Sequence, residues 1–498
     1  MGSLINAMKR ASTPSFVITL PLITTGRDLA VMRKRFEAGK RLYNALLSEG
    51  FKRLQAMRSD PVYASLRGEK DPTKKRAGYK HLRDKFGFSE YALSSFATSL
   101  KNQLWKDHLG AHEPQTLAKR VFAALDEYQF KKRGKPRFKG RKRPLHSLEG
   151  KSAASAIRYQ AETGCVLWAG LAMRALAGAP GKDTYLDEAL SKRVKYARVL
   201  WKMIKGQRRY FAQLIVEGKA PQTVVAQAGI GGLDVGPSTV ASVTAQGAEL
   251  QQFCPSVVPC AKTLRRLQRQ ADRSVRSTNP HCFDEKGRWI KGQRINTVSS
   301  RLKAIRADIA EMERKLQATR QNEHGQLVNH LLRQATVWQT ERLSYKAFQK
   351  LFGKSVKNRA PGYFINHLKR KAESAGGQVI ELNTRLLKMS QYNHVSGGYE
   401  KKPLSLRWHA LGDGRGAIQR DVYSALLACC TDGIGHNPTR IETMLAAQES
   451  VLKRAGLWRE QSASAVANAT APVKTGRVDG TLKKGRTQSQ RLKDRHPA

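Results

Sequence analysis

Asp234 is an acidic residue inside an apolar segment, where a carboxylate needs a chemical reason to be present. The segment, Ile230–Thr244, predicts two short strands joined by a turn at Gly236 and Pro237. Asp is depleted in strand interiors because its side chain competes with the backbone for hydrogen bonds. A cation would make the carboxylate tolerable there, and the flanking glycines would let a phosphate backbone approach closely. We interpret Asp234 as a metal ligand, although a turn Asp in a Gly-rich hairpin would give the same pattern.

Two further carboxylates could complete a metal site. Glu341 ends an apolar strand predicted in Gln334–Ser344, and Asp421 lies near the start of a helix predicted in Gly416–Leu427. Together with Asp234 they could hold two Mg²⁺ ions, or Mn²⁺ as a substitute, about 3.5–4 Å apart for in-line attack on a phosphodiester. The simpler alternatives are a strand-edge charge for Glu341 and a first-turn residue favoured by the helix dipole for Asp421. We predict that all three are catalytic and bind Mg²⁺.

The net charge points to a polyanionic partner. The 498 residues include 90 Lys and Arg against 39 Asp and Glu, a formal charge of +51. Such a charge destabilises a compact chain by self-repulsion, so a polyanion is expected to bind. The basic residues are spread over the whole chain instead of one juxtamembrane cluster, which favours nucleic acid over a membrane surface.

The cysteine count and the hydropathy pattern narrow the cellular context. Six cysteines in so long a chain do not make a disulfide framework, and no N-terminal stretch has the apolar core of a signal peptide. No run reaches the roughly 18 apolar residues needed to span a bilayer. We expect a protein of the bacterial cytosol or nucleoid with no membrane partner.

Two basic regions are predicted to contact nucleic acid. Lys131–Arg143 contains two Gly and one Pro, so it is no regular helix, and its nine cations could track phosphates while Phe138 offers a stacking face. A disordered linker is the alternative. The helical segments Ala261–Ser277 and Ile295–Gln321 are rich in Arg, although a hairpin with solvated faces would look similar. The predicted contact residues are Lys131, Lys132, Arg133, Lys135, Arg137, Phe138, Lys139, Arg141, Arg265, Arg266, Arg269 and Arg359.

Hydrophobic periodicity predicts the elements that must position these residues. A strand over Ser15–Ile23 is followed by helices to about residue 130. Separated strands around a helical block then indicate a β-barrel-like domain with a helical insertion: Ala156–Tyr159, Cys165–Trp168, a helical stretch near Leu186–Ile204, and Tyr210–Val216. Near the second acidic site we expect a helix over Tyr363–Ser374 and a strand over Gly377–Leu382.

At the three acidic sites the chain resembles the RuvC nuclease domain of the TnpB family and of compact type V CRISPR effectors. The matching segments are Gly232–Gly236, Thr340–Leu343 and Gln419–Ala425. Further similar stretches are Gly134–Gly140, Arg359–Gly362, and Lys371–Val379 followed by Leu387–Gln391. The resemblance implies an RNase H-like sheet, an N-terminal wedge barrel, a helical recognition lobe, a bound guide RNA, and a double-stranded DNA target found through a short flanking motif.

The resulting fold class is multidomain α+β, with an RNase H-like (RuvC) α/β nuclease domain, a β-barrel wedge domain and a helical recognition lobe. The expected boundaries are 1–26 for the first part of the wedge, 27–130 for the helical lobe, 131–228 for the basic arm and the rest of the wedge, 229–390 for the nuclease domain with a helical hairpin at about 261–330, 391–415 for a degenerate zinc-finger-like module, 416–461 for the C-terminal nuclease part, and 462–498 for a disordered basic tail.

The chain departs from the family where zinc-binding cysteines are usual. Segments Tyr392–Gly398 and His409–Gly414 occupy that place without a cysteine. Zinc needs about four well-placed ligands, and His394 and His409 supply at most two. We therefore expect no zinc site. Elsewhere Cys254 and Cys260 lack zinc-knuckle spacing, and Cys429 and Cys430 are expected to be buried helix residues.

The sequence predicts an RNA-guided, Mg²⁺-dependent DNA endonuclease in CRISPR defence, acting as a monomer or a dimer on its guide. A transposon-encoded TnpB-type nuclease is the alternative within this class. The missing zinc cysteines and the long N-terminal helical region favour the CRISPR side. From another class, a guided DNA-binding protein could repress without cutting, but such a protein has no use for three converging acids.

Overall fold

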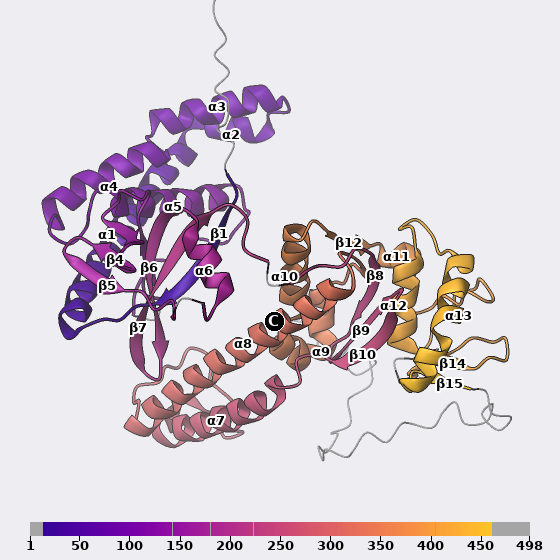
Figure 1. Ribbon diagram of the computed structural model, residues 1–498. Helices are drawn as coiled ribbons and strands as arrows, with labels where there is room; N and C mark the ends of the chain where they lie inside the picture. The colour runs from indigo at the N-terminus through magenta and orange to yellow at the C-terminus, as the bar shows by residue number, and fades with distance from the viewer. Residues whose placement is uncertain (1–12, 142, 180, 223, 404, 461–498) are drawn as a thin grey trace, which may run out of the picture. The chain divides into compact units, whose positions relative to one another are not determined.

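The computed structural model describes residues 13–141, 143–179, 181–222, 224–403 and 405–460 (Figure 1). The predicted basic tail, 462–498, lies outside these residues. The chain forms two compact units, each built from separate segments. Of the described residues, those within 13–226, 254–333 and 366–377 form the first unit, and those within 227–253, 334–365 and 378–460 form the second.

The first unit begins with the predicted strand and helices. Strand β1 is Ser15–Pro21, and the helices are α1 (Gly26–Ser59), α2 (Pro61–Gly68), α3 (Pro72–Lys85), α4 (Glu90–Leu104) and α5 (His112–Gln129). Thr25 caps α1: its hydroxyl accepts from Asp28 N at 3.2 Å, and its own N–H donates to the Asp28 carboxylate at 2.8 Å. The apolar stripe of α1, including Leu42, Leu46 and Leu47, is buried in the core of the unit.

Two antiparallel sheets complete this core. The first has the order β1-β7-β6-β2, with β2 at Ser147–Glu149, β6 at Val194–Ile204 and β7 at Gln207–Glu217. The second has the order β3-β4-β5, with β3 at Ile157–Gln160, β4 at Cys165–Trp168 and β5 at Leu171–Arg174. Trp168 joins this sheet to the helices, because its indole N–H donates to the buried Glu113 carboxylate of α5 at 2.9 Å.

The prediction of a helix over Leu186–Ile204 is wrong for most of its length. Helix α6 covers only Thr184–Ser191, and Val194–Ile204 is strand β6. Branched and aromatic residues such as Val199 and Trp201 favour a pleated strand, and β6 pairs with β7 along its length. Tertiary pairing thus overrides the weak helical periodicity.

A helical hairpin also belongs to the first unit. Helix α7 (Val257–Thr278) and α8 (Ser300–Gln334) correspond to the predicted Arg-rich pair and are longer than expected, with a short 3-10 turn, η1 (Pro280–Cys282), between them. Asn279 fixes the connection by accepting from Thr297 N at 2.9 Å. At the other end Ser256 N donates to Glu323 of α8 at 3.1 Å, so the two helices run antiparallel.

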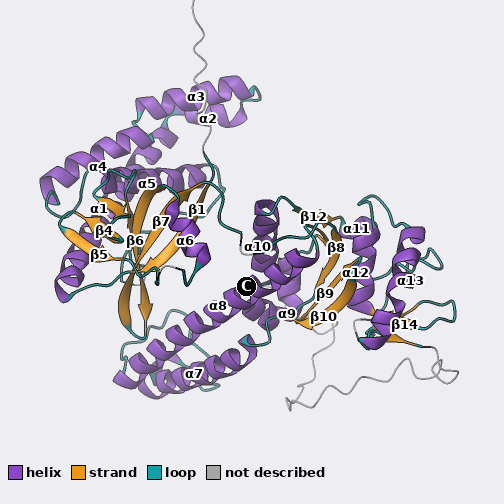
Figure 2. Ribbon diagram, in the orientation of Figure 1, coloured by secondary structure: helices purple, strands orange, loops and turns teal. Residues whose placement is uncertain are grey.

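The second unit is built on a five-stranded mixed sheet of order β10-β9-β8-β11-β12 (Figure 2). The strands are β8 (Ile230–Val235), β9 (Thr239–Thr244), β10 (Gly247–Gln252), β11 (Val337–Glu341) and β12 (Gln378–Leu382). Strands β8, β9 and β10 form an antiparallel meander, whereas β11 runs parallel to both β8 and β12. The strands predicted around Asp234, Glu341 and residue 380 are confirmed.

Helices and a small sheet surround these strands. They are α9 (Tyr345–Arg359), α11 (Thr384–Leu387), α12 (Arg420–Cys430), α13 (Pro438–Arg454), and strands β13 (Trp408–Ala410), β14 (Ala417–Gln419) and β15 (Trp458–Arg459). Helix α10 (Pro361–Ser374) begins in this unit, but its residues from 366 onward belong to the first. The helix predicted from Gly416 begins only at Arg420, because Gly416 has φ 125° and residues 417–419 pair as β14. Gln419 caps α12 by accepting from Val422 N at 2.8 Å. Across the described part of the chain, no helix is apolar over a length that could cross a membrane.

Helix α12 crosses the sheet at unusually short range. A Cβ atom at Gly232 of β8 would lie 1.8 Å from the Ala425 carbonyl oxygen and 2.4 Å from Cys429 N. Both atoms belong to the α12 backbone, so they cannot yield as a flexible side chain would. On the next pleat, a Cβ at Gly231 would lie 2.6 Å from the Trp338 ring. Glycine at 232 is therefore a packing requirement, because the helix lies where a side chain would be.

We predict that Gly232→Ala destabilises the protein by about 3 kcal/mol or more, since the backbone of α12 must move to relieve the overlap. Guanidinium titration followed by circular dichroism measures the change. Gly247→Ala is the matched control in the same sheet, because a Cβ there meets nothing within 4 Å. It should change stability by less than about 1 kcal/mol, and an equal loss in both variants would contradict the packing argument.

Candidate active site

Asp234 and Glu341 lie side by side because β8 and β11 are parallel. Leu233 pairs with Thr340 in this ladder, so Asp234 and Glu341 are the next residues on neighbouring strands. Side chains alternate along a strand, so Asp234 projects from the same face as Gly232, which is the face that α12 covers. Two of the three predicted acids thus come from adjacent strands of one sheet.

The third acid enters from α12. Asp421 lies in the first turn of that helix, where the helix dipole favours a negative charge. Its carboxylate accepts from the Thr239 hydroxyl, at the start of β9, at 3.2 Å. The close approach of α12 over Gly232 is what brings this first turn near Asp234. Asp234, Glu341 and Asp421 are each partly accessible to solvent, so a ligand could reach them.

The negative charges of Asp421 and Glu341 act on Asp234. The pKa of Asp234 is raised well above its ordinary value, first by burial and then by the negative charges of Asp421 and Glu341, and Arg420 only partly opposes this. Burial also raises the pKa of Glu341, and a backbone N–H from Met389 offsets part of that effect. The protein alone therefore leaves the charge of this site poorly compensated.

This donor set fits Mg²⁺ by its chemistry. Carboxylate oxygens are the hard ligands that Mg²⁺ prefers, and a divalent cation would relieve the repulsion that raises the Asp234 pKa. The side chains do not yet form a closed site. Within the described residues, no three His, Cys, Asp or Glu side chains are close enough together to hold a metal ion as they stand. Coordination would require the side chains to move toward a shared centre.

The predicted nucleic-acid contacts fall into two groups. Arg265, Arg266 and Arg269 are exposed on α7, and the cations of the arm 131–141 are exposed apart from the half-buried Lys139. Arg359 is instead engaged within the second unit, where Nε donates to the Phe253 carbonyl at 2.5 Å and a terminal nitrogen donates to Ser355 Oγ at 2.7 Å. The structure gives Arg359 a role in fixing α9, and its contact with nucleic acid stays a prediction.

The two histidines of the cysteine-less module hold an aromatic cluster together. His394 contacts the Tyr423 hydroxyl at 2.8 Å through Nδ1 and Glu442 at 3.1 Å through Nε2. His409 stacks on the Tyr423 ring with centroids 4.0 Å apart, and Lys402 donates to its Nδ1 at 2.7 Å. Both rings thus have polar partners in the fold. That the module contains no zinc remains a prediction.

Sequence reasoning did not identify several residues of this region. Thr239 donates to Asp421, and the charge of Arg420 acts on Asp234. Both residues lie within a few positions of a predicted acid, and this closeness in the sequence could have identified them. No sequence pattern could have identified Tyr423 and Glu442, which contact His394, because the cluster forms only when α12 and α13 pack together. The expectation that Cys429 and Cys430 are buried helix residues is confirmed.

We predict that Asp234→Asn stabilises the metal-free protein. An acid whose folded pKa is raised costs stability once pH exceeds its unfolded pKa near 3.8. The cost is absent below that pH and present at pH 7, and the neutral amide removes it. In EDTA at pH 7 the gain should be about 1 kcal/mol or more, because a tenfold change in proton affinity corresponds to about 1.4 kcal/mol.

Denaturant titration at pH 4 and pH 7 measures this gain, which should grow with pH. Asp432→Asn is the control, because the pKa of Asp432 is shifted in the opposite direction: backbone N–H groups of Gly435 and Ile434 lower it. That variant should gain nothing at pH 7. A destabilised Asp234→Asn protein would show that the carboxylate is structural.

A second prediction concerns His409, whose pKa is lowered to about 3, first by burial and then by Lys402. Between pH 6.5 and 3 the unfolded chain binds a proton at this residue and the folded chain does not, so His409 makes stability fall as pH falls. His409→Phe keeps a ring for Tyr423 and should reduce the loss between pH 7 and pH 5 by about 1 kcal/mol or more. Equal profiles for His409→Phe and the parent would overturn the assignment.

The chain is similar to known proteins in its structure and not in its sequence. No family model matches the chain, and no curated protein is similar to it. A cryo-EM structure of a Cas12f1-sgRNA-target DNA complex is similar at 11% identity, over 83% of this chain and 98% of that chain, with a TM-score of 0.42. A cryo-EM structure of a CRISPR-Cas12f ternary complex is similar at 11% identity, over 82% of this chain and 83% of that chain, with a TM-score of 0.30.

Proposed function

We propose that the chain is an RNA-guided, Mg²⁺-dependent DNA endonuclease with a single RuvC-like site, cutting target DNA beside a short flanking motif in CRISPR defence. The observation that carries the proposal is the grouping of Asp234, Glu341 and Asp421 at one sheet, where Asp421 and Glu341 raise the cost of ionising Asp234. Three such acids in a chain of charge +51 suit phosphodiester chemistry on a bound polyanion. The proposed partners are a guide RNA and a double-stranded DNA target.

The sheet supports this class of site. Its order, β10-β9-β8-β11-β12, places an antiparallel meander beside two parallel strands, which is the arrangement of an RNase H-like nuclease core. In the proposal, the two antiparallel sheets of the first unit belong to the wedge barrel, and α1 to α5 form the recognition lobe. Target choice would come from guide pairing, with the protein reading backbone shape and a short duplex motif.

The roles of the residues follow from their positions. Asp234, Glu341 and Asp421 would hold Mg²⁺, which when bound supplies Lewis-acid stabilisation of the phosphate and lowers the pKa of an attacking water. Thr239 orients Asp421 through its hydroxyl. Arg420 adds a positive charge near Asp234, where negative charge develops on the phosphate during attack.

We predict that Asp234→Asn, Glu341→Gln and Asp421→Asn each abolish guided cleavage while leaving guide-directed binding within a few-fold of the parent. Removing one carboxylate weakens metal binding and charge stabilisation, which costs several kcal/mol of barrier, equivalent to about 10³-fold or more in rate. Binding depends on base pairing and on Lys and Arg contacts that these acids do not make. Cleavage and binding should be measured on the same preparations with the RNA that copurifies with the protein.

Glu400→Gln is the matched control, an exposed carboxylate of the same unit whose loss should leave cleavage at the parent rate. A parent that binds its target tightly but never cuts in Mg²⁺ or Mn²⁺ would favour a guided repressor. The observation that favours a repressor is that the three acids, as they stand, are not close enough together to hold a metal ion. If one of the three substitutions leaves cleavage intact, the assignment is wrong at that residue.

A further inference from the structure

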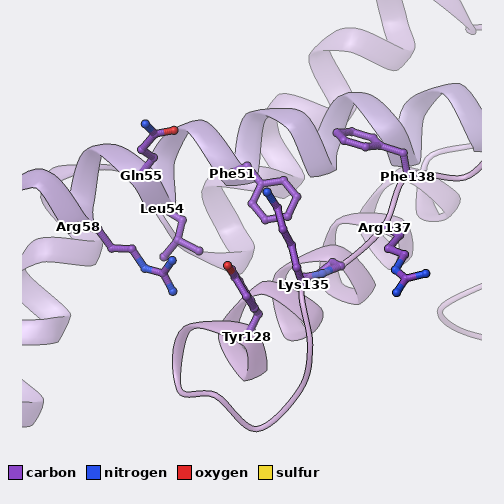
Figure 3. Close-up of a pocket in the computed structure, with 9 residues that line it drawn as sticks. Phe51, Leu54, Gln55, Arg58, Tyr128, Lys135, Arg137 and Phe138 are labelled. Carbon is purple, nitrogen blue, oxygen red and sulfur yellow. The ribbon is translucent and has the colours of Figure 1, made fainter. Parts of the chain in front are cut away.

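A hollow of about 600 Å³ lies in the first unit, between α1, the end of α5 and the basic arm (Figure 3). Its size is in the range of pockets that accept small ligands. The lining combines aromatic rings with cations, and none of the described lining residues is acidic: Phe51, Leu54, Gln55, Arg58, Tyr128, Lys135, Pro136, Arg137 and Phe138. Such a lining suits a planar group attached to an anion.

The three rings of the hollow do not stack on one another. Phe51 meets Tyr128 edge to face at 6.2 Å and lies tilted to Phe138 at 6.5 Å. Lys135 lies 5.1 Å from the Phe51 centroid, and Arg58 lies 5.1 Å from that of Tyr128. Phe138 remains 54% exposed. The two cations thus lie against Phe51 and Tyr128, and the exposed ring of Phe138 is the one on which a base could stack.

The arm is held against α1, so the hollow exists before any ligand binds. Asn44 of α1 makes two hydrogen bonds to Lys139: its side-chain oxygen accepts from the backbone N–H at 2.7 Å, and its amide donates to the carbonyl at 2.9 Å. Lys139 also lies 5.0 Å from the Tyr43 ring, and Pro136 is buried. These contacts favour a docked arm over the disordered linker considered above. A docked arm loses little conformational entropy when it binds.

We propose that this hollow binds one unpaired nucleotide of a nucleic acid strand, with its base stacked on Phe138 and its flanking phosphates on Arg58, Lys135 and Arg137. Base stacking on an aromatic ring tolerates any base, because every base has a π face. A paired base within a duplex cannot present that face. The Gln55 amide and the Tyr128 hydroxyl at the hollow can donate to or accept from a base edge.

The inference does not rest on the proposed cutting activity, and EDTA separates the two. The test measures affinity of the full chain, freed of copurified RNA, for a 12-nucleotide single strand carrying 2-aminopurine, as RNA and as DNA, and for the matching duplex. Phe138→Ala should lower single-strand affinity about 5- to 100-fold and abolish the stacking-dependent quenching of 2-aminopurine. It should change duplex affinity less than two-fold. Tyr91→Ala, which removes an 83% exposed ring of α4 outside the hollow, is the matched control and should change neither.

Lys135→Ala gives a second readout that does not depend on the ring. The slope of log affinity against log salt for the single strand should fall by about 0.7, the value for one phosphate contact. A larger loss for RNA than for DNA would assign the site to RNA, and the reverse to DNA. Equal losses of Phe138→Ala on single strand and duplex, or none on either, would overturn the proposal, as would a normal salt slope in Lys135→Ala.

Discussion

The close contact between α12 and β8 is the constraint on which the candidate site depends. Only a residue without a side chain fits at Gly232, since a Cβ there would overlap the helix backbone at Ala425. This packing fixes the first turn of α12, and with it Asp421, over the strand that carries Asp234. The parallel ladder then sets Glu341 beside Asp234. Helix packing and strand register, two features of the backbone, thus bring together acids that are 80 or more residues apart in the sequence.

The ionised carboxylate of Asp234 lowers the stability of the folded protein, and such a cost is typical of a functional site. The raised pKa of Asp234 means that ionising this residue costs energy in the folded protein. The chain carries a large excess of positive charge, yet among the described residues Arg420 is the one cation that lowers the Asp234 pKa. A site that keeps three acids together and poorly compensated is suited to a divalent cation and a phosphate. The basic surface would deliver the phosphate, and the acids would hold the cation.

The sequence predicted the strands and the helix that carry the three acids because these elements follow clear hydrophobic patterns, whereas the role of the acids as metal ligands stays a prediction. Asp234 breaks an apolar strand, and Glu341 ends one. Asp421 was assigned to a helix that actually begins four residues later than predicted, since Gly416 and β14 precede it. β6 was predicted as a helix because its pairing with β7 is not local. The hollow was not predictable as a site: the sequence predicts Phe138 as a stacking residue, but Phe51 and Tyr128 join it only through the packing of α1 and α5.

The most direct test of the metal site is anomalous X-ray diffraction from crystals soaked in Mn²⁺, recorded on both sides of the manganese absorption edge. The three acids should surround the anomalous density, with one or two peaks within about 2.5 Å of oxygens of Asp234, Glu341 and Asp421. Crystals of the Asp234→Asn variant should lose these peaks under the same conditions. Full occupancy elsewhere in the chain with none at the three carboxylates would contradict a metal-dependent site built on β8, β11 and α12.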